Sequence, residues 1–329
     1  MGDVVLAMIT KDSLKRVGSS IFANVLASTL QIPYKTLILI DDGADDTASF
    51  VRNWLASDKE LLMAKSNLYG YANPTRATAR QTAIDMFRSN FKEEWLMFVD
   101  DDVVLNPGWW DWVSENKVLE NPRVGEVWGI NWDISPQREM FLSMFGIDLQ
   151  QYLVRKFHER GGCHDTLYRR GAIDGIRIPP ELHVYEDAYL HYYVSRKGWE
   201  SVINPVGVKH YHQTGRVDLR SEKEKARIAI KAAVKYGIIE YETMRLMKKS
   251  RMKMILAYLS LLRPLLGFFP MLTVTVRIYG VRKGLSEAIK GQYLKVWFRW
   301  QVLRSIQSGA EVPDSSGRII PEAGSTKEL

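Results

Sequence analysis

Three consecutive aspartates, Asp100, Asp101 and Asp102, follow the apolar run 95–99 and are the residues best suited to chemistry. Five apolar residues bounded by charge predict a buried strand. Side chains alternate along a strand, so Asp100 and Asp102 are expected on one side and Asp101 on the other. Two carboxylates on one side repel each other unless a cation lies between them. Because Mg²⁺ and Mn²⁺ bind carboxylates together with substrate phosphates, the run predicts a metal–diphosphate site, with a solvated acidic turn as the alternative.

The first half of the chain alternates strand-like apolar runs with stretches of helical periodicity. This alternation predicts right-handed βαβ units and therefore an α/β fold, with a mostly parallel sheet flanked by helices. Ligands of such sheets bind beyond the carboxyl ends of the strands. Three polar clusters are expected at that edge: Thr10-Lys11, Asp41-Asp42 and the three aspartates. The expected strands are 4–8, 36–40, 61–64 and 95–99, and the expected helices cover 14–26, 50–55 and 76–87.

Beyond residue 124 the apolar runs become shorter. We expect strands at 127–132, 166–168, 201–204 and 206–211, and a helix over 185–197. Residues 135–165 are weakly periodic, with a mobile stretch expected near Gly161-Gly162. Residues 221–247 predict a long basic helix, and the Pro- and Gly-containing residues 309–329 predict a flexible tail.

Charge is unevenly distributed along the chain. The net charge is +7, but residues 1–214 carry −5, residues 215–304 carry +14 and the last 25 residues carry −2. A basic block behind a mildly acidic region predicts an anionic partner. The single cysteine, Cys163, excludes an intrachain disulfide, and no secretory signal precedes the first predicted strand, so the catalytic part is expected in the cytoplasm.

A set of ordered motifs resembles the family 2 glycosyltransferases of the GT-A fold. This inverting group includes polyprenyl-phosphate sugar synthases and cellulose-synthase-like membrane enzymes. The resemblance covers roughly residues 4–216. It is carried by Thr10-Lys11, Leu39-Ile-Asp-Asp-Gly43, Ala79-Arg-Gln-Thr-Ala83, Val99-Asp-Asp-Asp102, Glu186-Asp187, Lys197-Gly-Trp199 and Val208-Lys-His210.

The resemblance implies a nucleotide site on the first half of the sheet. Asp41 and Asp42 match the pair that contacts the base and ribose, with a capped turn as the alternative. Arg80 matches an arginine near the nucleotide, although Gln81 stands where Asn is usual, and a surface-facing arginine is the alternative. Thr10, Lys11, Asp100 and Asp101 complete the expected nucleotide contacts.

The resemblance also assigns metal and catalytic roles. Asp100 and Asp102 match the Asp-x-Asp signature that holds Mn²⁺ or Mg²⁺ on the diphosphate, with Asp102 expected as the direct ligand. His210 matches a further metal or phosphate contact, and a structural histidine is nearly as plausible a reading. Asp187, with Glu186 beside it at a helix start, matches the general base that deprotonates the acceptor hydroxyl; an ordinary acidic first turn is the alternative.

Residues 213–216, Gln-Thr-Gly-Arg, resemble part of the Gln-x-x-Arg-Trp signature of cellulose synthases, but Val217 replaces the Trp. The acceptor-binding role of that signature is therefore in doubt here. Arg216 remains a candidate phosphate contact.

The C-terminal region is both basic and apolar. Residues 254–276 contain one charge, Arg263, and would reach about 35 Å as one helix, but Pro264, Gly267 and Pro270 divide them. Basic residues flank both ends, so a helix pair dipping into one leaflet is favoured over a full span. Residues 293–304 mix aromatic and cationic side chains, which is typical of an interfacial helix. The alternative is a soluble helical subdomain; nucleic-acid binding is disfavoured, since 23 nearly uncharged residues have no use in an electrostatic groove.

Together these observations predict a GT-A catalytic domain at 1–216 (1–124 for the nucleotide, 125–216 for the acceptor), a membrane-associated helical region at 217–308 and a tail at 309–329. The expected reaction moves a sugar from a nucleotide sugar of the GDP-mannose or UDP-glucose type. The expected acceptor is lipid-linked, a polyprenyl or dolichyl phosphate or a diphosphate glycan, at the cytoplasmic face of the membrane. A metal-dependent nucleotidyl or phosphoryl transferase and a non-catalytic glycan- or lipid-binding protein remain alternatives. Sugar, nucleotide, acceptor, processivity and oligomeric state stay open.

Overall fold

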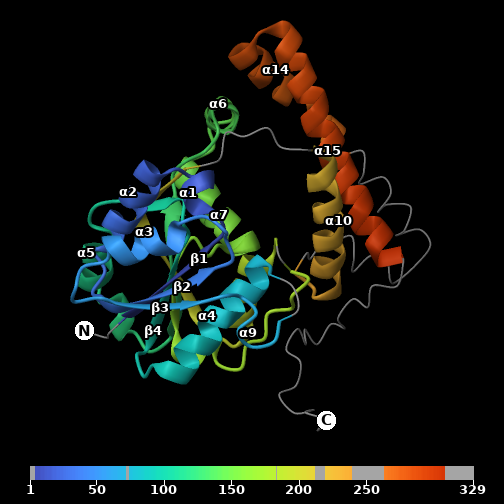
Figure 1. Ribbon diagram of the computed structural model, residues 1–329. Helices are drawn as coiled ribbons and strands as arrows, with labels where there is room; N and C mark the ends of the chain where they lie inside the picture. Colours follow the sequence, from blue (N-terminus) through green and yellow to red (C-terminus); the bar gives the residue numbers. More distant parts are fainter. Residues whose placement is uncertain (1–3, 72–73, 183, 212–218, 239–262, 308–329) are drawn as a thin grey trace. The chain divides into compact units, whose positions relative to one another are not determined.

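The computed structural model describes residues 4–71, 74–182, 184–211, 219–238 and 263–307 (Figure 1). They fall into two compact units. The sheet unit lies within residues 1–133 and 153–217, and the helical unit lies within 134–152 and 218–319. Residues 134–152 were expected in the acceptor half of the catalytic domain, but they cluster with the helical unit.

The sheet unit is built on one mixed sheet of the order β3-β2-β1-β4-β7-β6-β8-β5. Strands β3, β2, β1 and β4 are parallel, β7 is antiparallel to both β4 and β6, β6 and β8 are parallel, and β5 pairs antiparallel with β8. The strands are β1 (Val4–Thr10), β2 (Tyr34–Asp41), β3 (Glu60–Ala64), β4 (Trp95–Val99), β5 (Val103–Leu105), β6 (Val124–Asn131), β7 (Asp165–Arg169) and β8 (Glu200–His210).

Helices cover both faces of this sheet, which is why its central strands are buried throughout. Figure 1 shows α2 and α3 on one side and α4 and α9 on the other. The core under α2 and α3 includes Leu6, Met8, Phe22, Leu37 and Trp95. The helices of the unit are α1 (Ser13–Arg16), α2 (Ser19–Thr29), α3 (Thr47–Trp54), α4 (Arg76–Asn90), α5 (Trp109–Glu115), the short 3₁₀ turn Val118–Glu120, α7 (Leu149–Arg160), α8 (Arg170–Ile173) and α9 (Glu186–Arg196).

The expected elements of the first half are confirmed with one exception. The helix predicted over residues 14–26 is two helices, because Gly18 has a φ of 91° and breaks the helical path between α1 and α2. Helix α4 begins at Thr75, whose hydroxyl accepts a hydrogen bond from the Thr78 backbone in a capping box.

The second half differs more from the expectations. The runs 201–204 and 206–211 form one strand, β8, whose pairing with β6 shifts register between Gly129 and Asn131. Residues 135–165 contain two helices, α6 (Pro136–Met144) and α7, where only weak periodicity was expected. Strand β5 and helix α5 were not predicted.

The helical unit contains α6, α10 (Leu219–Lys235), α13 (Arg263–Leu266), α14 (Phe268–Tyr279) and α15 (Val281–Gln307). Helix α14 turns into α15 at Gly280, which has a φ of 78°. The two helices pack closely at Gly284. A Cβ atom at this position would lie only 2.5 Å from Val276 Cα, so a larger residue would not fit. The hydroxyl of Thr275 donates to the Gly284 carbonyl across this contact at 2.8 Å.

The division expected within residues 254–276 is confirmed in the part that is described. Helices α13 and α14 are separated at Gly267, and Pro270 lies in the first turn of α14, where its missing N–H leaves no bond unmade. Among the described residues, every helix is too short or too polar to span a bilayer. Residues 239–262, Arg216 and the predicted tail lie outside the described residues.

Candidate functional site

The carboxyl ends of β1, β2, β4, β6 and β8 meet at one edge of the sheet, which we call the rim. The strand directions require this, and they also bring the amino end of the antiparallel strand β7 to the same place. In the register, Val99 at the end of β4 pairs with Asp165 at the start of β7. The predicted polar clusters therefore do converge.

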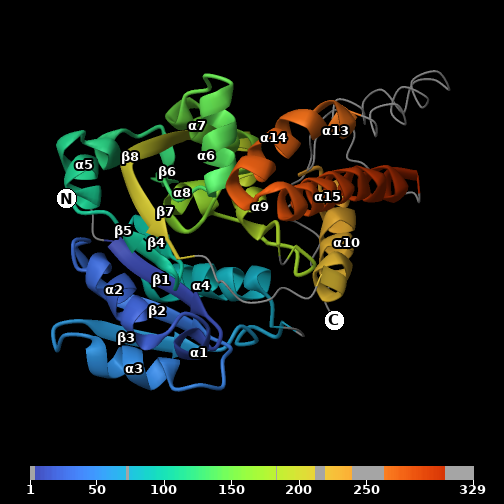
Figure 2. The same ribbon diagram turned by 90° about the horizontal axis from the view of Figure 1, so that it is seen from above.

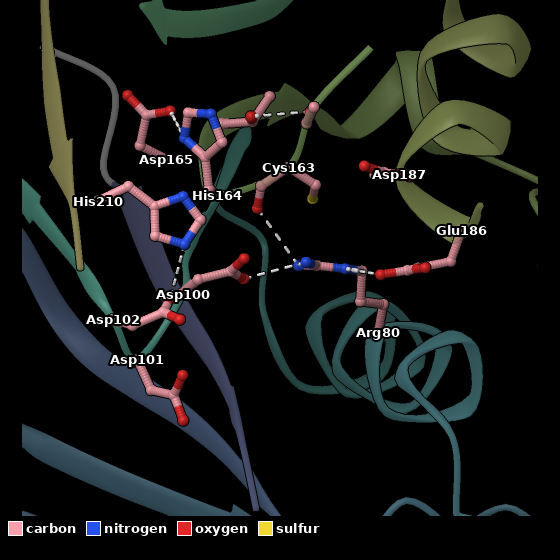
Figure 3. Close-up of polar contacts among 12 residues, drawn as sticks. Arg80, Asp100, Asp101, Asp102, Cys163, His164, Asp165, Glu186, Asp187 and His210 are labelled. Carbon is pink, nitrogen blue, oxygen red and sulfur yellow. Dashed lines mark hydrogen bonds and ion pairs between the residues drawn. The ribbon is translucent and has the colours of Figure 1, made fainter. Parts of the chain in front are cut away.

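The three aspartates form a turn at the end of β4. Asp100 pairs with Arg80 and Asp101 with Arg16, while Asp102 pairs with His210 and also lies 3.7 Å from Arg16. Figure 3 shows Asp101 pointing away from Asp100 and Asp102, as strand alternation predicts. However, Asp100 and Asp102 do not face one shared partner. Asp100 Oδ1 lies 3.0 Å from Arg80 Nη2, whereas Asp102 Oδ1 lies 3.1 Å from His210 Nε2.

Asp101 is engaged with the protein rather than with the rim. Its carboxylate is buried and accepts hydrogen bonds from the Ser13 hydroxyl and the Arg16 guanidinium of α1. Burial raises the pKa of Asp101, and the Arg16 charge opposes that shift. Asp101 was expected to contact the nucleotide, but its carboxylate instead binds Ser13 and Arg16 after the end of β1.

The Asp102–His210 pair is a partly exposed acid–base pair of the rim. Their side chains keep 15% and 20% of their surface exposed. Asn131 Nδ2 lies 3.3 Å from His210 Nδ1, and the His210 backbone N–H donates to Asp133 Oδ2 at 2.9 Å, which fixes the ring between β6 and β8. Burial acts to lower the pKa of His210, but the hydrogen bond to Asp102 together with the negative charges of Asp102, Asp100 and Asp133 raises the pKa overall. Burial likewise acts to raise the pKa of Asp102, and the same bond lowers it.

The donor set at this pair fits a divalent cation that also binds a ligand. Asp102 supplies carboxylate oxygens and His210 an imidazole nitrogen, both partly exposed at adjacent positions. Among the described residues, no three His, Cys, Asp or Glu side chains are grouped closely enough to hold a metal by themselves. Mg²⁺ commonly binds with about one or two protein carboxylates and completes its coordination with substrate phosphates and water. Of the three predicted ligands, Asp100 is paired with Arg80 and Asp102 also lies 3.7 Å from Arg16, so a cation held by Asp102 and His210 would lie beside the Arg16 charge.

Arg80 occupies the centre of the rim and is almost completely buried, at 3% exposed. It was expected near the nucleotide or on the surface. Its guanidinium instead bridges Asp100 and Glu186, with Nε 3.4 Å from Glu186 Oε1, and donates to the Cys163 carbonyl at 3.3 Å (Figure 3). Burial alone would lower the pKa of Arg80, and the neighbouring acidic groups raise it above the ordinary value.

Glu186 and Asp187, the first two residues of α9, separate into a buried and an accessible acid. Glu186 is 1% exposed, and burial raises its pKa to about 7, with the Asp187 charge adding to the shift. Its expected catalytic role beside Asp187 does not fit this burial against Arg80. Asp187 is half-buried, accepts a hydrogen bond from the Ala188 backbone at 2.8 Å, and acts electrostatically on Arg80. Figure 3 shows it on the Cys163 side of the cluster.

The residues at the ends of β1 and β2 hold a turn. Asp41 is buried and accepts hydrogen bonds from the Thr10 hydroxyl at 3.0 Å and the Gly43 backbone at 2.9 Å. Asp42 accepts from the Ser66 backbone at 3.0 Å, and Lys11 is exposed. This is the capped-turn alternative of the sequence analysis, and it leaves Asp42 half-buried at the rim.

Several rim residues were missed. His164 and Asp165 lie at the start of β7, with His164 Nδ1 2.6 Å from Asp165 Oδ1, although the two are not aligned for a hydrogen bond. Asp165 accepts from Trp109 Nε1 at 2.8 Å, and Trp128 Nε1 donates to His164 Nε2 at 3.2 Å. The sequence analysis expected site residues only after the ends of strands. Because β7 is antiparallel, its first residues lie at the rim instead.

Comparisons with known proteins support the fold. No protein-family model matches the chain, and no curated protein sequence matches it. Among solved structures, it is similar to the mannosyltransferase PcManGT from Pyrobaculum calidifontis in complex with GDP-Man and Mn²⁺. The identity is 14%, covering 93% of this chain and 86% of that one, with a TM-score of 0.50. The fold is the GT-A fold.

A second similar structure is glucosyl-3-phosphoglycerate synthase from Mycobacterium tuberculosis in complex with Mn²⁺, UDP and glucosyl-3-phosphoglycerate. The identity is 11%, covering 73% of this chain and 81% of that one, with a TM-score of 0.48. Both structures contain Mn²⁺ together with a nucleotide or a nucleotide sugar, and at these identities the similarity shows the fold alone.

Proposed function

We propose that this protein is a metal-dependent inverting glycosyltransferase of the family 2 type that moves a sugar from a nucleotide sugar to a lipid-linked acceptor. The observation that carries the proposal is the arrangement around Arg80 on a GT-A sheet. An accessible Asp102–His210 pair lies at the rim, and an accessible carboxylate, Asp187, lies at the start of α9. The Asp102–His210 pair suits a cation on the diphosphate, and Asp187 suits the incoming hydroxyl.

The chain's own residues divide the work in this mechanism. Asp102 and His210 would hold the cation, and when bound it neutralises charge that develops on the departing diphosphate. Asp187 takes the proton of the acceptor hydroxyl as its oxygen attacks the anomeric carbon. Attack from the face opposite the leaving group inverts the anomeric configuration.

Buried groups keep these side chains in place. Arg80 holds Asp100 by an ion pair, and its second pair with Glu186 anchors the first turn of α9 next to Asp187. Since the Arg80 guanidinium is buried, water does not compete with Asp100 and Glu186 for its N–H groups. Arg80 and Glu186 are therefore positioning residues rather than catalytic ones.

The lipid-linked acceptor rests on charge and composition. Residues 215–304 carry 20 Lys and Arg against 6 Asp and Glu, together with the nearly uncharged run 254–276. A polyprenyl phosphate or a diphosphate glycan has an anionic head and an apolar chain, which matches both properties. Equal turnover with phosphoglycerate and with a polyprenyl phosphate in detergent would contradict this assignment.

The test of the activity is a thermal-shift series with GDP, UDP and their sugar conjugates, with and without Mn²⁺, followed by product analysis. We expect a metal-dependent stabilisation by one nucleoside diphosphate and release of that diphosphate on transfer. Release of inorganic diphosphate from a nucleoside triphosphate would indicate a nucleotidyl transferase instead. Metal-dependent binding without turnover, unaffected by Asp187→Asn, would indicate a non-catalytic binding protein.

A further inference from the structure

Helix α15 exposes a continuous apolar face along most of its length. Val281, Leu285, Ile289 and Tyr293 follow each other at intervals of four residues, with exposed fractions of 73%, 43%, 53% and 54%. Trp300, 41% exposed, lies seven residues further on the same side. We call these five residues the α15 stripe. It extends over about 29 Å at the helical rise of about 1.5 Å per residue.

The stripe is not the face by which α15 packs in its own unit. The neighbouring face of the helix is buried at Gly284, Ala288 and Gln292, and Gly284 packs against Val276 of α14. Helix α10 also packs on α15, with Lys223 Nζ 3.1 Å from the Tyr293 hydroxyl. The stripe is thus a different surface from the face that packs on α14, and it meets α10 at Tyr293.

Cationic side chains border the stripe. Helix α15 carries six Lys and Arg residues and one acidic residue, Glu287. Lys223 adds a seventh cation, lying 4.3 Å from the centre of the Tyr293 ring. An apolar band with an aromatic ring and a Trp between basic residues is the composition of helices that lie in the plane of a membrane interface.

A smaller apolar group lies at α13 and the start of α14. Leu265, Leu266 and Phe269 are 51%, 82% and 73% exposed. The helical unit therefore exposes large apolar side chains at two places. Monomeric soluble proteins rarely expose contiguous apolar surface of this kind without a binding partner for it.

We propose that the α15 stripe docks on an anionic lipid surface, with α15 lying in the headgroup plane. Charge complementarity selects this partner: basic residues border the stripe, and acidic headgroups neutralise them while the apolar residues enter the acyl boundary. A second copy of this chain would place the same cations opposite each other. The inference names a partner for the proposed enzyme, but it does not depend on sugar transfer.

The test is vesicle flotation with the full purified chain, using phosphatidylcholine vesicles with and without phosphatidylglycerol. We expect binding to the acidic vesicles to be at least about tenfold tighter than to the neutral ones, because each interfacial Lys or Arg contributes about 1 kcal/mol. Ile289→Glu should weaken binding to acidic vesicles by about tenfold or more, because it places a carboxylate in the centre of the stripe.

Leu68→Glu is the matched control, because Leu68 in the sheet unit is also 53% exposed. It should bind vesicles like the wild type. Leu285→Glu provides a second stripe variant, and circular dichroism with thermal unfolding verifies that the variants fold.

Flotation has no nucleotide in it, so it separates this inference from the proposed activity. A folded Ile289→Glu variant that binds like the wild type would overturn the inference, as would a wild type that ignores acidic vesicles. A wild type that is dimeric without lipid, and that Ile289→Glu makes monomeric without loss of vesicle binding, would assign the stripe to self-association instead. Tight vesicle binding together with absent nucleotide binding would support the docking surface and contradict the proposed glycosyltransferase activity.

Discussion

Two acid–base pairs of the rim have similar ionic chemistry but differ in how much of their surface solvent can reach. The Asp102–His210 pair keeps 15% and 20% of its side-chain surface exposed, whereas the Arg80–Glu186 pair keeps 4% and 2%. A cation can replace the proton that the first pair shares, because solvent and ligand reach it. The second pair is closed off and can only support its neighbours. Burial therefore distinguishes the reactive side of the rim from its scaffold better than residue type does.

The largest effect is expected from Asp187→Asn, which removes the base next to the scaffold and leaves the shape unchanged. Turnover should fall by about a thousandfold, in the range for a lost general base. Nucleotide affinity should stay within about twofold, since the Asp102–His210 pair is untouched. Turnover measured under saturating donor, together with a binding titration, checks both. A variant with unchanged turnover would move the base elsewhere, with His164 as the next candidate.

Arg80→Met tests the scaffold side of the comparison. Removing one partner from a buried ion pair leaves uncompensated charge, which costs about 3–5 kcal/mol. We expect about 3 kcal/mol in chemical unfolding, because Glu186 can take up a proton and Asp100 is partly exposed. Arg123→Met is the control, since its pair with Glu200 is exposed and should contribute less than about 1 kcal/mol. Equal losses in both variants would contradict the distinction between the pairs.

His210→Ala tests the reactive side. Loss of the imidazole should weaken Mn²⁺-dependent nucleotide binding by at least about tenfold, while the protein stays folded. Isothermal titration with and without Mn²⁺ measures this directly. If the Mn²⁺ dependence is unchanged, His210 is a structural residue, the alternative that the sequence left open.

A smaller effect on stability than that of Arg80→Met is expected from Glu186→Gln, and it depends on pH. The pKa of Glu186 is about 7 in the folded protein, against the ordinary 4.5. The folded state therefore binds the proton more tightly, and ionisation costs stability as the pH rises from about 4.5 to about 7. Relative to the wild type, the variant should gain about 2–3 kcal/mol between pH 5 and pH 8. Thermal unfolding across this range checks the sign; a flat difference would mean that Glu186 is ionised throughout.

The parts of the fold that local patterns determine were predicted from the sequence. Strand β4 was predicted with its observed bounds, because five consecutive apolar residues are all buried. Helix α6 was missed although the N-cap Ser135 and the following Pro136 are a local start signal, because its packing partner α14 lies more than 120 residues away. The unexpected break at Gly18 depends on a backbone conformation that residue type permits but does not require.

Motifs named the candidate residues of the rim, but the pairings among them were not foreseen. Asp102, His210 and Asp187 were named from motifs, and the structure brings their elements to one rim. The burial of Arg80 was not foreseen, because an arginine on a helix is usually exposed and only its contacts with Asp100, Glu186 and the Cys163 carbonyl make this placement favourable. His164 was missed because ligand-binding residues were expected after the ends of strands, whereas β7 is antiparallel and places its first residues at the rim.

The aspartate turn is fastened at both ends by the main chain. The Asp100 N–H donates to the His164 carbonyl at 2.8 Å, and the Tyr211 N–H donates to the Asp102 carbonyl at 2.8 Å. A loop tied in this way to β7 on one side and to the end of β8 on the other has little conformational entropy left to lose when a ligand arrives. Discrimination among donors should therefore show itself as differences in dissociation rate, with association that is fast and nearly uniform.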